Sequence, residues 1–334
     1  MKKFKNGLVL GKFYPFHLGH KFLIDTAITN CDTVHILVCS LPNETISGGF
    51  RANWIKETYK DNKNVKVYHI DKELPQYPNE CESVDIFYKL WCTVVYSAVK
   101  ELDVVFTSEE YGDEFAQYLN VEHFLVDKER KTFPISGTKI RNNNLENWEF
   151  IPDVAKSYFT KRVVLLGPES VGKSTMTKML ADHFGVGYVE EYGRTYTEEH
   201  GTDNLSAMDF ENITMGQSKL LVEELRNNPN KLVICDTEAI TTKVFGEMYI
   251  DGFENDMIES FIKLQKYDLY LLLDVDVEWK QDGSREFPNE REKHFNKLEQ
   301  QLNYYNKPYK KISADGDYQK RFEKAVQLVE KLIK

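Results

Sequence analysis

Cysteine is scarce and scattered in this chain of 334 residues. The five cysteines form no C-x-x-C pair, so the sequence supports neither a disulfide framework nor a structural zinc site. No run approaches the roughly 18 consecutive apolar residues that a transmembrane helix needs. The apolar run near the N-terminus is too short for a signal peptide. We therefore expect a cytoplasmic protein without membrane insertion.

Basic charge is also in short supply. Lysine and arginine together number 43 against 53 aspartates and glutamates, which gives a net charge of −10. Non-specific nucleic-acid binding depends on basic surface, so no nucleic acid is expected as a partner. An anionic ligand must instead be held by local groups, such as helix N-termini or a few basic side chains. The sequence leaves open whether the chain forms a homo-oligomer.

The first half alternates short apolar segments with helical patterns. This alternation predicts an α/β fold in which helices cover both faces of a parallel sheet. The expected strands are 8–11, 34–39, 65–70, 104–107 and 121–126, and the expected helices include 21–29, 50–59 and 86–99.

The second half begins the same pattern again, after a polar stretch at 142–147. We expect one domain over 1–147, a linker over 148–160 and a second α/β domain over 161–334. We detect no internal sequence repeat. The expected strands of the second domain are 162–166, 231–235, 268–274 and 309–313, and its last helix is 318–333.

The stretch GPESVGKS at 167–174 matches the phosphate-binding loop pattern G-x-x-x-x-G-K-[ST], and it lies between a predicted strand and helix as that loop requires. Lys173 would reach the β- and γ-phosphates of ATP, and Ser174 would ligate Mg²⁺. A chance match in a surface loop is the alternative, which the context disfavours. The expected nucleotide-binding residues here are Gly167, Glu169, Ser170, Gly172, Lys173, Ser174 and Thr175.

Acidic residues follow two later strands of this half. Asp236 ends an apolar strand, where ligands of open α/β sheets bind. It would hold Mg²⁺ or accept a proton from a substrate hydroxyl; the alternative is a helix cap. In the stretch EEYGR, Glu190, Glu191 and Arg194 are candidates for binding the phosphate acceptor, against plain surface charge as the alternative.

Arg285 and Arg291 lie in a segment that contains glycine and proline. Such a segment suits a mobile lid that brings guanidinium groups onto the transferring phosphate. The alternative is a solvated charged loop.

The stretch GKFYPFHLGH at 11–20 places two histidines three residues apart after the first strand. A structural zinc site would need four ligands, and no further histidine or cysteine is spaced to complete one. We favour a phosphate clamp, in which backbone N–H groups, His17, His20 and Lys12 converge on a triphosphate and neutralise its charge. The alternative is two histidines that satisfy local backbone groups. Gly11 and Phe13 complete the expected ATP-binding residues of this loop.

The stretch FPISGTKIR at 133–141 would supply the other side of that clamp. Ser136 or Thr138 can cap a helix and direct N–H groups and hydroxyls toward an anion. Arg141 follows Thr138 by three residues, which places it on the same helix face.

These motifs resemble the nucleotidyltransferase superfamily with its H-x-G-H signature, and G-[KR]-F-x-P-F-H-x-G-H resembles nicotinamide mononucleotide adenylyltransferases. With a phosphate-binding-loop kinase behind it, the chain resembles the NadR family over nearly its whole length. Other stretches that carry the resemblance are VFTSEEYG (105–112), NWEFIP (147–152), EEYGR (190–194), CDTE (235–238) and WKQDGSRE (279–286).

The resemblance implies a Rossmann-like nucleotidyltransferase domain followed by a phosphate-binding-loop kinase domain. The kinase would phosphorylate ribosylnicotinamide with ATP and Mg²⁺, and the first domain would join the resulting mononucleotide to ATP, giving NAD and pyrophosphate. It also implies small molecules as the partners, triphosphate contacts from His17 and His20 with Lys12 nearby, and phosphate contacts from Ser136, Thr138 and Arg141 on the other side.

Three departures from the family pattern stand out. Well-known members begin with a helix-turn-helix domain, and the first strand here is expected at about residue 7, so this chain is not expected to act as a repressor. Cys81 stands where a tryptophan near the nicotinamide is common, and Trp91 is a candidate substitute. Thr195 replaces a common aspartate, so a carboxylate contact to the riboside is expected to be lost.

Two other functions fit parts of the sequence. One is a pantetheine-phosphate adenylyltransferase fused to a dephospho-coenzyme A kinase, although that adenylyltransferase usually carries T-x-G-H, whereas this chain has H-L-G-H. The other is a sensor that binds ATP and NAD without turnover. The intact Lys173, Ser174, Asp236 and histidine pair favour chemistry over sensing.

Overall fold

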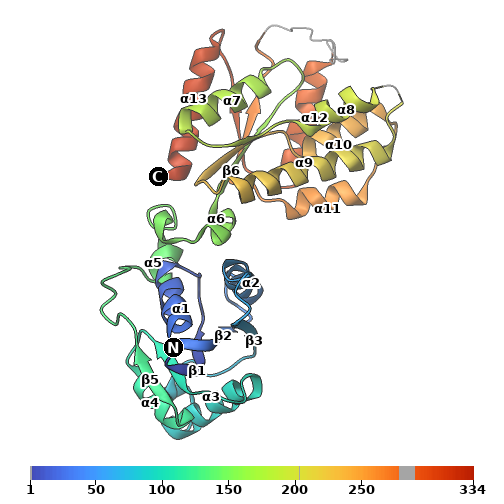
Figure 1. Ribbon diagram of the computed structural model, residues 1–334. Coiled ribbons are helices and arrows are strands. Elements are labelled where there is room, and N and C mark those ends of the chain that lie inside the picture. The colour runs from blue at the N-terminus through green and yellow to red at the C-terminus, as the bar shows by residue number, and fades with distance from the viewer. Residues whose placement is uncertain (1, 203, 278–289) are drawn as a thin grey trace. The chain divides into compact units, whose positions relative to one another are not determined.

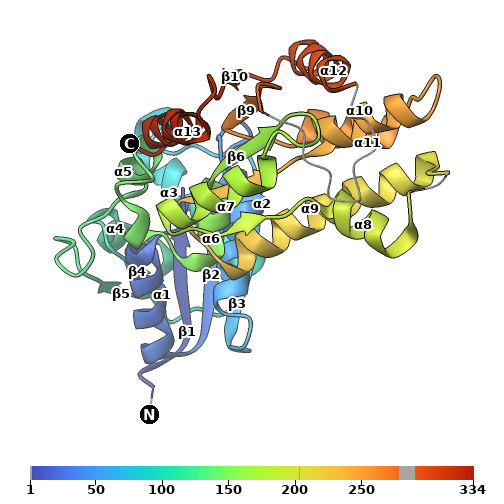
Figure 2. The ribbon, with the colours of Figure 1, turned by 90° about the horizontal axis from the view of Figure 1, so that it is seen from above.

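The computed structural model describes residues 2–202, 204–277 and 290–334. The chain forms two compact units, Met1–Lys156 and Ser157–Lys334. Their boundary falls inside the segment 148–160, which is not an extended linker, because it contains η2 (Trp148–Phe150) and α6 (Asp153–Phe159). Each unit has one five-stranded sheet, as expected, and every described strand pair is parallel (Figures 1 and 2).

The first unit has the strand order β3-β2-β1-β4-β5. The five predicted strands are confirmed, and the first begins earlier than expected. The strands are β1 (Phe4–Gly11), β2 (Cys31–Ser40), β3 (Val65–Asp71), β4 (Val104–Thr107) and β5 (Glu122–Leu125), and the helices are α1 (Leu18–Asn30), α2 (Gly48–Thr58), η1 (Pro78–Glu80), α3 (Val84–Ala98), α4 (Tyr111–Leu119) and α5 (Gly137–Asn142).

Apolar packing fixes the central strand β1 of this unit. Leu8 of β1 and Val105 of β4 are fully buried in a cluster with Trp91 of α3 and Phe115 of α4, so α3 and α4 cover one face of the sheet. The chain connects β1, β2 and β3 through α1 and α2, and right-handed crossovers place those helices on the other face. The carboxyl ends of β1, β2 and β4 therefore meet at one edge of the sheet.

The second unit has the order β10-β9-β6-β8-β7. Its four predicted strands are confirmed, and the short edge strand β7 precedes the stretch EEYGR. The strands are β6 (Lys161–Leu166), β7 (Tyr188–Val189), β8 (Leu232–Asp236), β9 (Leu269–Leu273) and β10 (Tyr309–Ile312), and the helices are α7 (Lys173–Phe184), α8 (Tyr192–His200), α9 (Ala207–Asn227), α10 (Ala239–Tyr249), α11 (Asp256–Leu264), α12 (Arg291–Tyr304) and α13 (Tyr318–Ile333).

Two buried clusters cover the two faces of this second sheet. On one face, Met176 and Leu180 of α7 pack with Val329 of α13. The cluster on the other face draws on α9, α10, α11 and α12 and includes Leu298. The strands are largely apolar on both sides, as buried parallel strands are, and polar side chains for a site lie at the carboxyl ends of the strands and in the loops that follow.

A hydroxyl–imidazole pair closes the carboxyl end of β2. The Ser40 Oγ lies 2.8 Å from the Nε2 of His69 on β3. Gly48, the first residue of α2, packs directly on this pair. A Cβ atom at Gly48 would lie 2.1 Å from His69 Nε2 and 2.3 Å from Ser40 Oγ, which is far inside van der Waals contact.

The same arrangement recurs at the carboxyl end of β4. The Thr107 Oγ1 lies 2.8 Å from the Nε2 of His123 on β5. A Cβ at Gly112 of α4 would lie 2.2 Å from that nitrogen and 2.3 Å from Thr107 Oγ1. Helices α2 and α4 thus both begin with a glycine packed on a hydroxyl–imidazole pair between neighbouring strands. The sequence contains no repeat that reveals this similarity.

Alanine at position 48 is expected to destabilise the first unit. Overpacking of a filled site costs about 1–3 kcal/mol, so Gly48→Ala should lower the free energy of unfolding in urea by that amount. The matched control is Gly49→Ala, where the nearest atom to the added Cβ is Ser47 Oγ at 3.8 Å. That change should be neutral or stabilise by up to about 1 kcal/mol, because alanine favours the helix. Equal effects of the two changes would contradict the packing described here.

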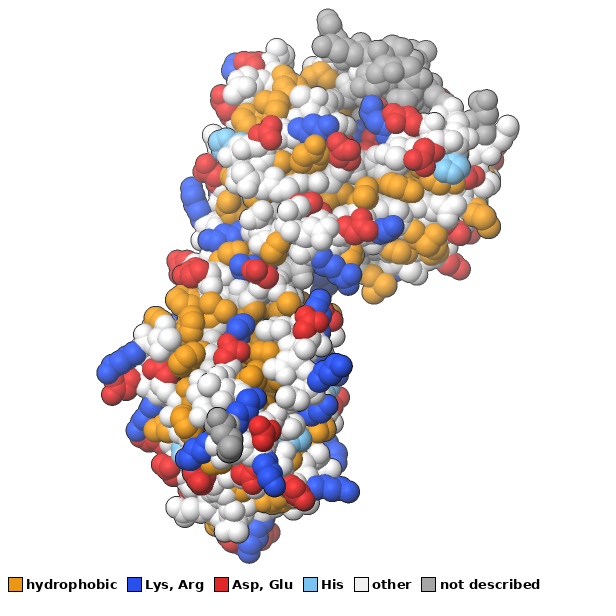
Figure 3. All heavy atoms as spheres, in the orientation of Figure 1, with side chains coloured by type: hydrophobic (Ala, Val, Ile, Leu, Met, Phe, Trp, Pro, Cys, Tyr) orange, Lys and Arg blue, Asp and Glu red, His pale blue; other side chains and the backbone are white. Residues whose placement is uncertain are grey.

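Charged side chains are interspersed over the surface. On the face in Figure 3, lysines and arginines alternate with aspartates and glutamates among the described residues. Among those residues no helix is long and apolar enough to cross a membrane.

Candidate functional site

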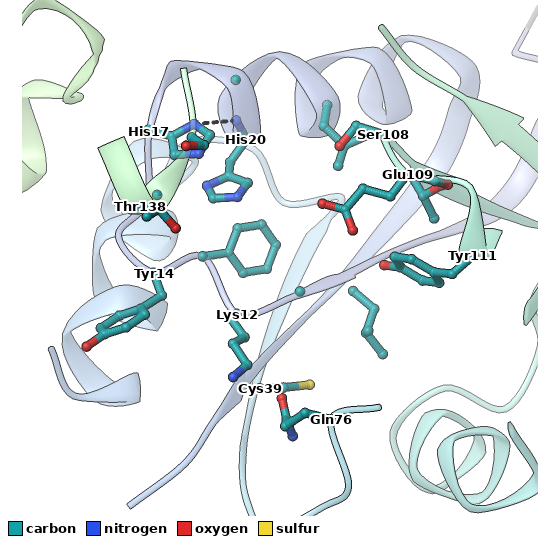
Figure 4. A pocket seen from close by; sticks show the side chains of 18 of the residues that line it. Lys12, Tyr14, His17, His20, Cys39, Gln76, Ser108, Glu109, Tyr111 and Thr138 are labelled. Carbon is teal, nitrogen blue, oxygen red and sulfur yellow. Dashed lines mark hydrogen bonds between the residues drawn. The ribbon is translucent and has the colours of Figure 1, made fainter. Parts of the chain in front are cut away.

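The first unit has a cavity of about 710 Å³ at the edge where β1, β2 and β4 end. The loop after β1 and the start of α5 line it from two sides, so GKFYPFHLGH and ISGTKIR meet, as predicted (Figure 4). All eight residues predicted for this nucleotide site line it: Gly11, Lys12, Phe13, His17, His20, Ser136, Thr138 and Arg141.

The two histidines form one stacked unit at the start of α1. His17 is the N-cap of that helix, and its Nδ1 accepts a hydrogen bond of 3.3 Å from the backbone N–H of His20. The rings stack with centroids 3.6 Å apart. Since Nδ1 of His17 accepts, the proton of its neutral ring lies on Nε2, which leaves an N–H free to face a ligand.

The structure corrects the expectation that this pair neutralises a triphosphate. Burial, and then the positive charge of Arg130, lower the pKa of His17 to about 3. Burial, the neighbouring His17 and Arg130 lower the pKa of His20 well below its ordinary value. Both imidazoles are therefore neutral near pH 7. The N–H of His17 can donate a hydrogen bond to a phosphate oxygen, and that of His20 can do so while it also contacts the carbonyl of Pro15, whose hydrogen bond acts to raise the pKa of His20. The positive charge must come from other residues.

This depressed pKa predicts a loss of stability in acid. Between pH 6.5 and 3 the unfolded chain binds a proton at His17 that the folded chain does not, so the free energy of unfolding falls as the pH falls. At about 1.4 kcal/mol per pH unit, that histidine alone costs about 2 kcal/mol between pH 6.5 and 5. The measurement is urea unfolding followed by tryptophan fluorescence.

Asparagine at position 17 provides the comparison, because it can still cap α1 and does not titrate. His17→Asn should be less sensitive to acid by about that amount. Of the other titrating groups, His20 feels the change directly, because His17 helps to lower its pKa, and its own burial keeps that pKa depressed in both proteins. An identical pH dependence in the two would show that the folded His17 titrates normally.

Aromatic side chains from α3 and from the segment before η1 also line this cavity. Tyr77, Tyr88 and Trp91 line it, and the Nε1 of Trp91 donates a hydrogen bond of 3.0 Å to the carbonyl of Pro75. Cys81, which stands where a tryptophan was expected, does not line the cavity. The cavity thus has an aromatic surface without an aromatic residue at position 81, and Trp91, the candidate substitute for the missing tryptophan, is part of that surface.

The second unit has a cavity of about 300 Å³ beside the phosphate-binding loop. Loop residues 169–170 and 172–175 line it, and Gly167 begins the loop where β6 ends. Gly172 is in the left-handed conformation, with φ 85°, and opens α7. Lys173 is buried, and its Nζ donates a hydrogen bond of 3.0 Å to the carbonyl of Pro168. The motif therefore has the strand–loop–helix context that it predicts.

Asp236 lies at the end of β8, beside this loop. Burial, and then the nearby Glu191, raise its pKa to about 6, while Lys173, a hydrogen bond from Ser174 and Arg194 act in the opposite direction. Its Oδ1 is buried with no hydrogen-bond partner in the described part of the chain. The Asp236 carboxylate can therefore bind a proton or a cation through this oxygen.

The donor set at this point fits Mg²⁺. Oxygen ligands suit that ion, which usually takes one or two protein ligands and completes its shell with phosphates and water. The Ser174 hydroxyl and the unpartnered Asp236 oxygen are of that kind. Among the described residues no group of three or more histidines, cysteines or acidic residues could hold a metal by itself.

Four residues are predicted to bind the phosphate acceptor, namely Glu190, Glu191, Arg194 and Asp236, and two of them line the cavity. Glu191 and Arg194 line it. The prediction for Glu190 is corrected, because its carboxylate lies 3.1 Å from Lys178 Nζ of α7 and is largely exposed. Successive side chains at a strand end point to opposite sides, which separates Glu190 from Glu191. Thr195 is exposed and does not line the cavity.

The predicted lid is only partly described. Arg285 lies outside the described residues. Arg291 is the first residue of α12, and its Nη1 donates a hydrogen bond of 2.9 Å to the carbonyl of Val277. It is not among the residues that line the second cavity, so its place supports no direct contact with the nucleotide.

The last helix, α13, holds the phosphate-binding loop, and this contact was not predicted from the sequence. Tyr318 donates a hydrogen bond of 2.8 Å from its hydroxyl to the carbonyl of Gly172. The fully buried Arg321 donates 2.8 Å and 2.9 Å hydrogen bonds to the carbonyls of Val171 and Asp274. The sequence does contain a sign of this contact, because Arg321 places a charge on the buried face that α13 otherwise forms with small apolar residues.

Gln217 of α9 is a second positioning residue that was missed. Its amide oxygen accepts from the N–H of Tyr192 at 2.8 Å, and its amide nitrogen donates to the carbonyls of Glu190 and Asp236 at 3.1 and 3.3 Å. One buried side chain therefore links the ends of β7 and β8 to the start of α8. No motif marks it in the sequence.

Comparison with known proteins matches the two units separately and the chain as a whole. Residues 162–321 match the family described as an AAA domain, and residues 7–155 match the citrate lyase ligase C-terminal domain. The trifunctional NAD biosynthesis/regulator proteins NadR of Escherichia coli (strain K12) and Salmonella typhimurium (strain LT2) are each 30% identical over 350 residues, which covers 98% of this chain and 83% of each relative.

Solved structures agree with the fold. A NadR protein in complex with NR has a TM-score of 0.82, and a NadR protein in complex with NAD and AMP-PNP has a TM-score of 0.79. Each is 24% identical to this chain, and each match covers 99% of this chain and 97% of the other. The predicted succession of a nucleotidyltransferase-like domain and a phosphate-binding-loop domain is confirmed.

Proposed function

The chain belongs to the NadR family, and from that membership we propose that it makes NAD in two steps, one in each unit. The second unit phosphorylates ribosylnicotinamide with ATP, giving nicotinamide mononucleotide. The first unit transfers the adenylyl group of a second ATP to that product, giving NAD and pyrophosphate. The observation that carries the proposal is the presence of both motifs, each lining its own cavity at the carboxyl edge of a parallel sheet.

In the kinase step, Lys173 binds the β- and γ-phosphates, and Ser174 and Asp236 hold Mg²⁺. Glu191 and Arg194 bind the riboside beside the loop. The alternative role for Asp236 is that of proton acceptor: with the ion held by Ser174 and the phosphates instead, its raised pKa, about 6, suits a group that accepts the proton of the attacking riboside hydroxyl. Mg²⁺ would neutralise the phosphate charge that develops during transfer.

In the adenylyl-transfer step, the neutral N–H groups of His17 and His20 donate hydrogen bonds to the triphosphate, and Ser136 and Thr138 approach it from α5. The nicotinamide ring lies toward the aromatic side chains of Tyr77, Tyr88 and Trp91. The phosphate of the mononucleotide attacks the α-phosphorus directly, so no covalent enzyme intermediate forms. Catalysis then consists of positioning and charge stabilisation. A cytoplasmic location fits the free cysteines of the described chain.

The test is to incubate the purified protein with ribosylnicotinamide, ATP and Mg²⁺ and to identify the products. NAD and pyrophosphate are expected. Nicotinamide mononucleotide alone would assign activity only to the second unit. No consumption of the riboside would contradict the proposal, and parallel incubations with phosphopantetheine and with dephospho-coenzyme A would then test the coenzyme A alternative.

A further inference from the structure

Three cations line the first cavity in the described chain, namely Lys12, Arg130 and Arg141, and each of them already contacts another protein group. Lys12 lies 3.3 Å from the carboxylate of the largely buried Glu44. Arg141 donates a short hydrogen bond to the carbonyl of Tyr14, and its guanidinium lies over the Tyr14 ring at 4.3 Å. Moving Arg141 toward a ligand would break its contacts with the loop that forms the site, and moving Lys12 would leave Glu44 with Arg51 as its cationic partner.

Arg130 differs in its carboxylate partner, which is exposed, whereas Glu44 is largely buried. Its Nη2 lies 3.4 Å from Glu109 Oε1, and its Nη1 lies 3.5 Å from the carbonyl of Ile135. The side chains of Arg130 and Glu109 are 43% and 58% exposed, and an exposed ion pair of this kind contributes little to stability. The guanidinium can therefore change partners at small cost.

The backbone, by contrast, fixes Arg130 in place. Asp127 and Arg130 have φ angles of 44° and 52°, in the left-handed region that residues with a side chain rarely adopt. The N–H of Arg130 bonds to the carbonyl of Asp127 at 2.8 Å. The Asp127 carboxylate accepts from the N–H groups of Lys131 and Thr132 at 2.9 and 3.0 Å. Glycine would relieve this strain, but it would not supply a guanidinium to the cavity.

Arg130 also lies close enough to His17 and His20 for its charge to affect both rings. Its partner Glu109 extends from the end of β4 toward the same pair (Figure 4). A triphosphate that accepts hydrogen bonds from the two neutral imidazoles would thus come within range of Arg130. It would compete with a single carboxylate, and guanidinium binds phosphate through two parallel hydrogen bonds.

We infer that Arg130 binds the phosphates that leave as pyrophosphate, and that Glu109 holds its guanidinium until the nucleotide arrives. The inference rests on the adenylyl transfer proposed for this unit. In that step an oxygen of the mononucleotide phosphate bonds to the α-phosphorus of ATP. The bond from that phosphorus to the oxygen bridging the β-phosphate breaks, and pyrophosphate departs with the electron pair. Arg130 stabilises the charge that accumulates on it.

The test compares Arg130→Met with Lys131→Met, which removes the same charge from the next residue of the same turn, where Lys131 pairs with the exposed Glu129. Two measurements are made on the full chain. The first is NAD formation from the mononucleotide and ATP, with the reverse reaction at varied pyrophosphate. The second is calorimetric binding of magnesium pyrophosphate in a Lys173→Ala background, which removes the competing loop of the second unit.

Arg130→Met should lower the rate of NAD formation about a hundredfold and weaken pyrophosphate binding at least tenfold, with Lys131→Met within twofold of the parent. Arg130→Lys should recover part of the loss. Glu109→Gln should strengthen pyrophosphate binding, because the competing charge is gone. Unchanged riboside phosphorylation and an unchanged thermal midpoint would show that Arg130→Met is folded.

Equal behaviour of Arg130→Met and Lys131→Met would overturn the assignment of Arg130, and unchanged pyrophosphate binding in Glu109→Gln would overturn the role of Glu109. A parent protein that makes no NAD from the mononucleotide would refute the proposed function. Calorimetry would still decide whether Arg130 binds pyrophosphate.

Discussion

Lys173→Ala should abolish phosphorylation of ribosylnicotinamide and leave NAD formation from nicotinamide mononucleotide unchanged. Lys173 is the buried cation at the start of α7. It would contact the γ-phosphate, which is transferred, and the β-phosphate, which stays on the nucleotide. Removing such a contact costs about 10²–10³ in kcat. The two activities are measured separately, the first with the riboside and the second with the mononucleotide supplied directly.

Lys178→Ala is the matched control, because Lys178 lies on the same helix but is exposed and paired with Glu190. It should retain both activities. Loss of both activities in Lys173→Ala would refute the assignment of one reaction to each unit. Retention of riboside phosphorylation would refute the role of the loop.

His20→Ala should have the opposite effect. NAD formation from the mononucleotide should fall about 10²–10³-fold, because a hydrogen-bond donor to the triphosphate is lost, and riboside phosphorylation should not change. The structure adds a sharper expectation. Since the imidazole is neutral throughout, the ratio of wild-type to variant rate should be constant between pH 6.5 and 8.5.

His35→Ala serves as the control for this change. His35 lies on β2, where its Nδ1 is 3.2 Å from the Tyr68 hydroxyl, and it does not line the cavity. A ratio that grows as the pH falls would instead mean that His20 acts as a cation when the nucleotide is bound. That result would restore the charge-neutralising role that the sequence suggested.

The sequence predicts best what depends on neighbouring residues. A strand, a glycine turn and a helix follow one another around Lys173 and around His20, so short motifs contain both the residues and the local geometry that they need. Parallel strands then bring separate motifs to one sheet edge, which is why the meeting of His17 with Ser136 was predictable.

Properties that depend on tertiary surroundings were not predictable in this way. The neutrality of the histidines follows from burial and from Arg130, which is remote in sequence. Glu190 and Glu191 are adjacent in the sequence, and only the placement of β7 beside α7 decides which of them faces the cavity. Arg321 had a signal, as a charge on a buried helix face, but its partner Val171 is 150 residues away.

The contact of α13 with the phosphate-binding loop has a consequence for biosynthesis. The loop is made early in the second unit, at 167–174, but the side chains that hold two of its carbonyls belong to Tyr318 and Arg321. During synthesis, about 150 further residues must therefore be added after the loop before the side chains that hold it are present. A chain interrupted before that helix would carry the complete first unit and an unsupported kinase loop. Premature termination would thus uncouple the two reactions without touching either motif.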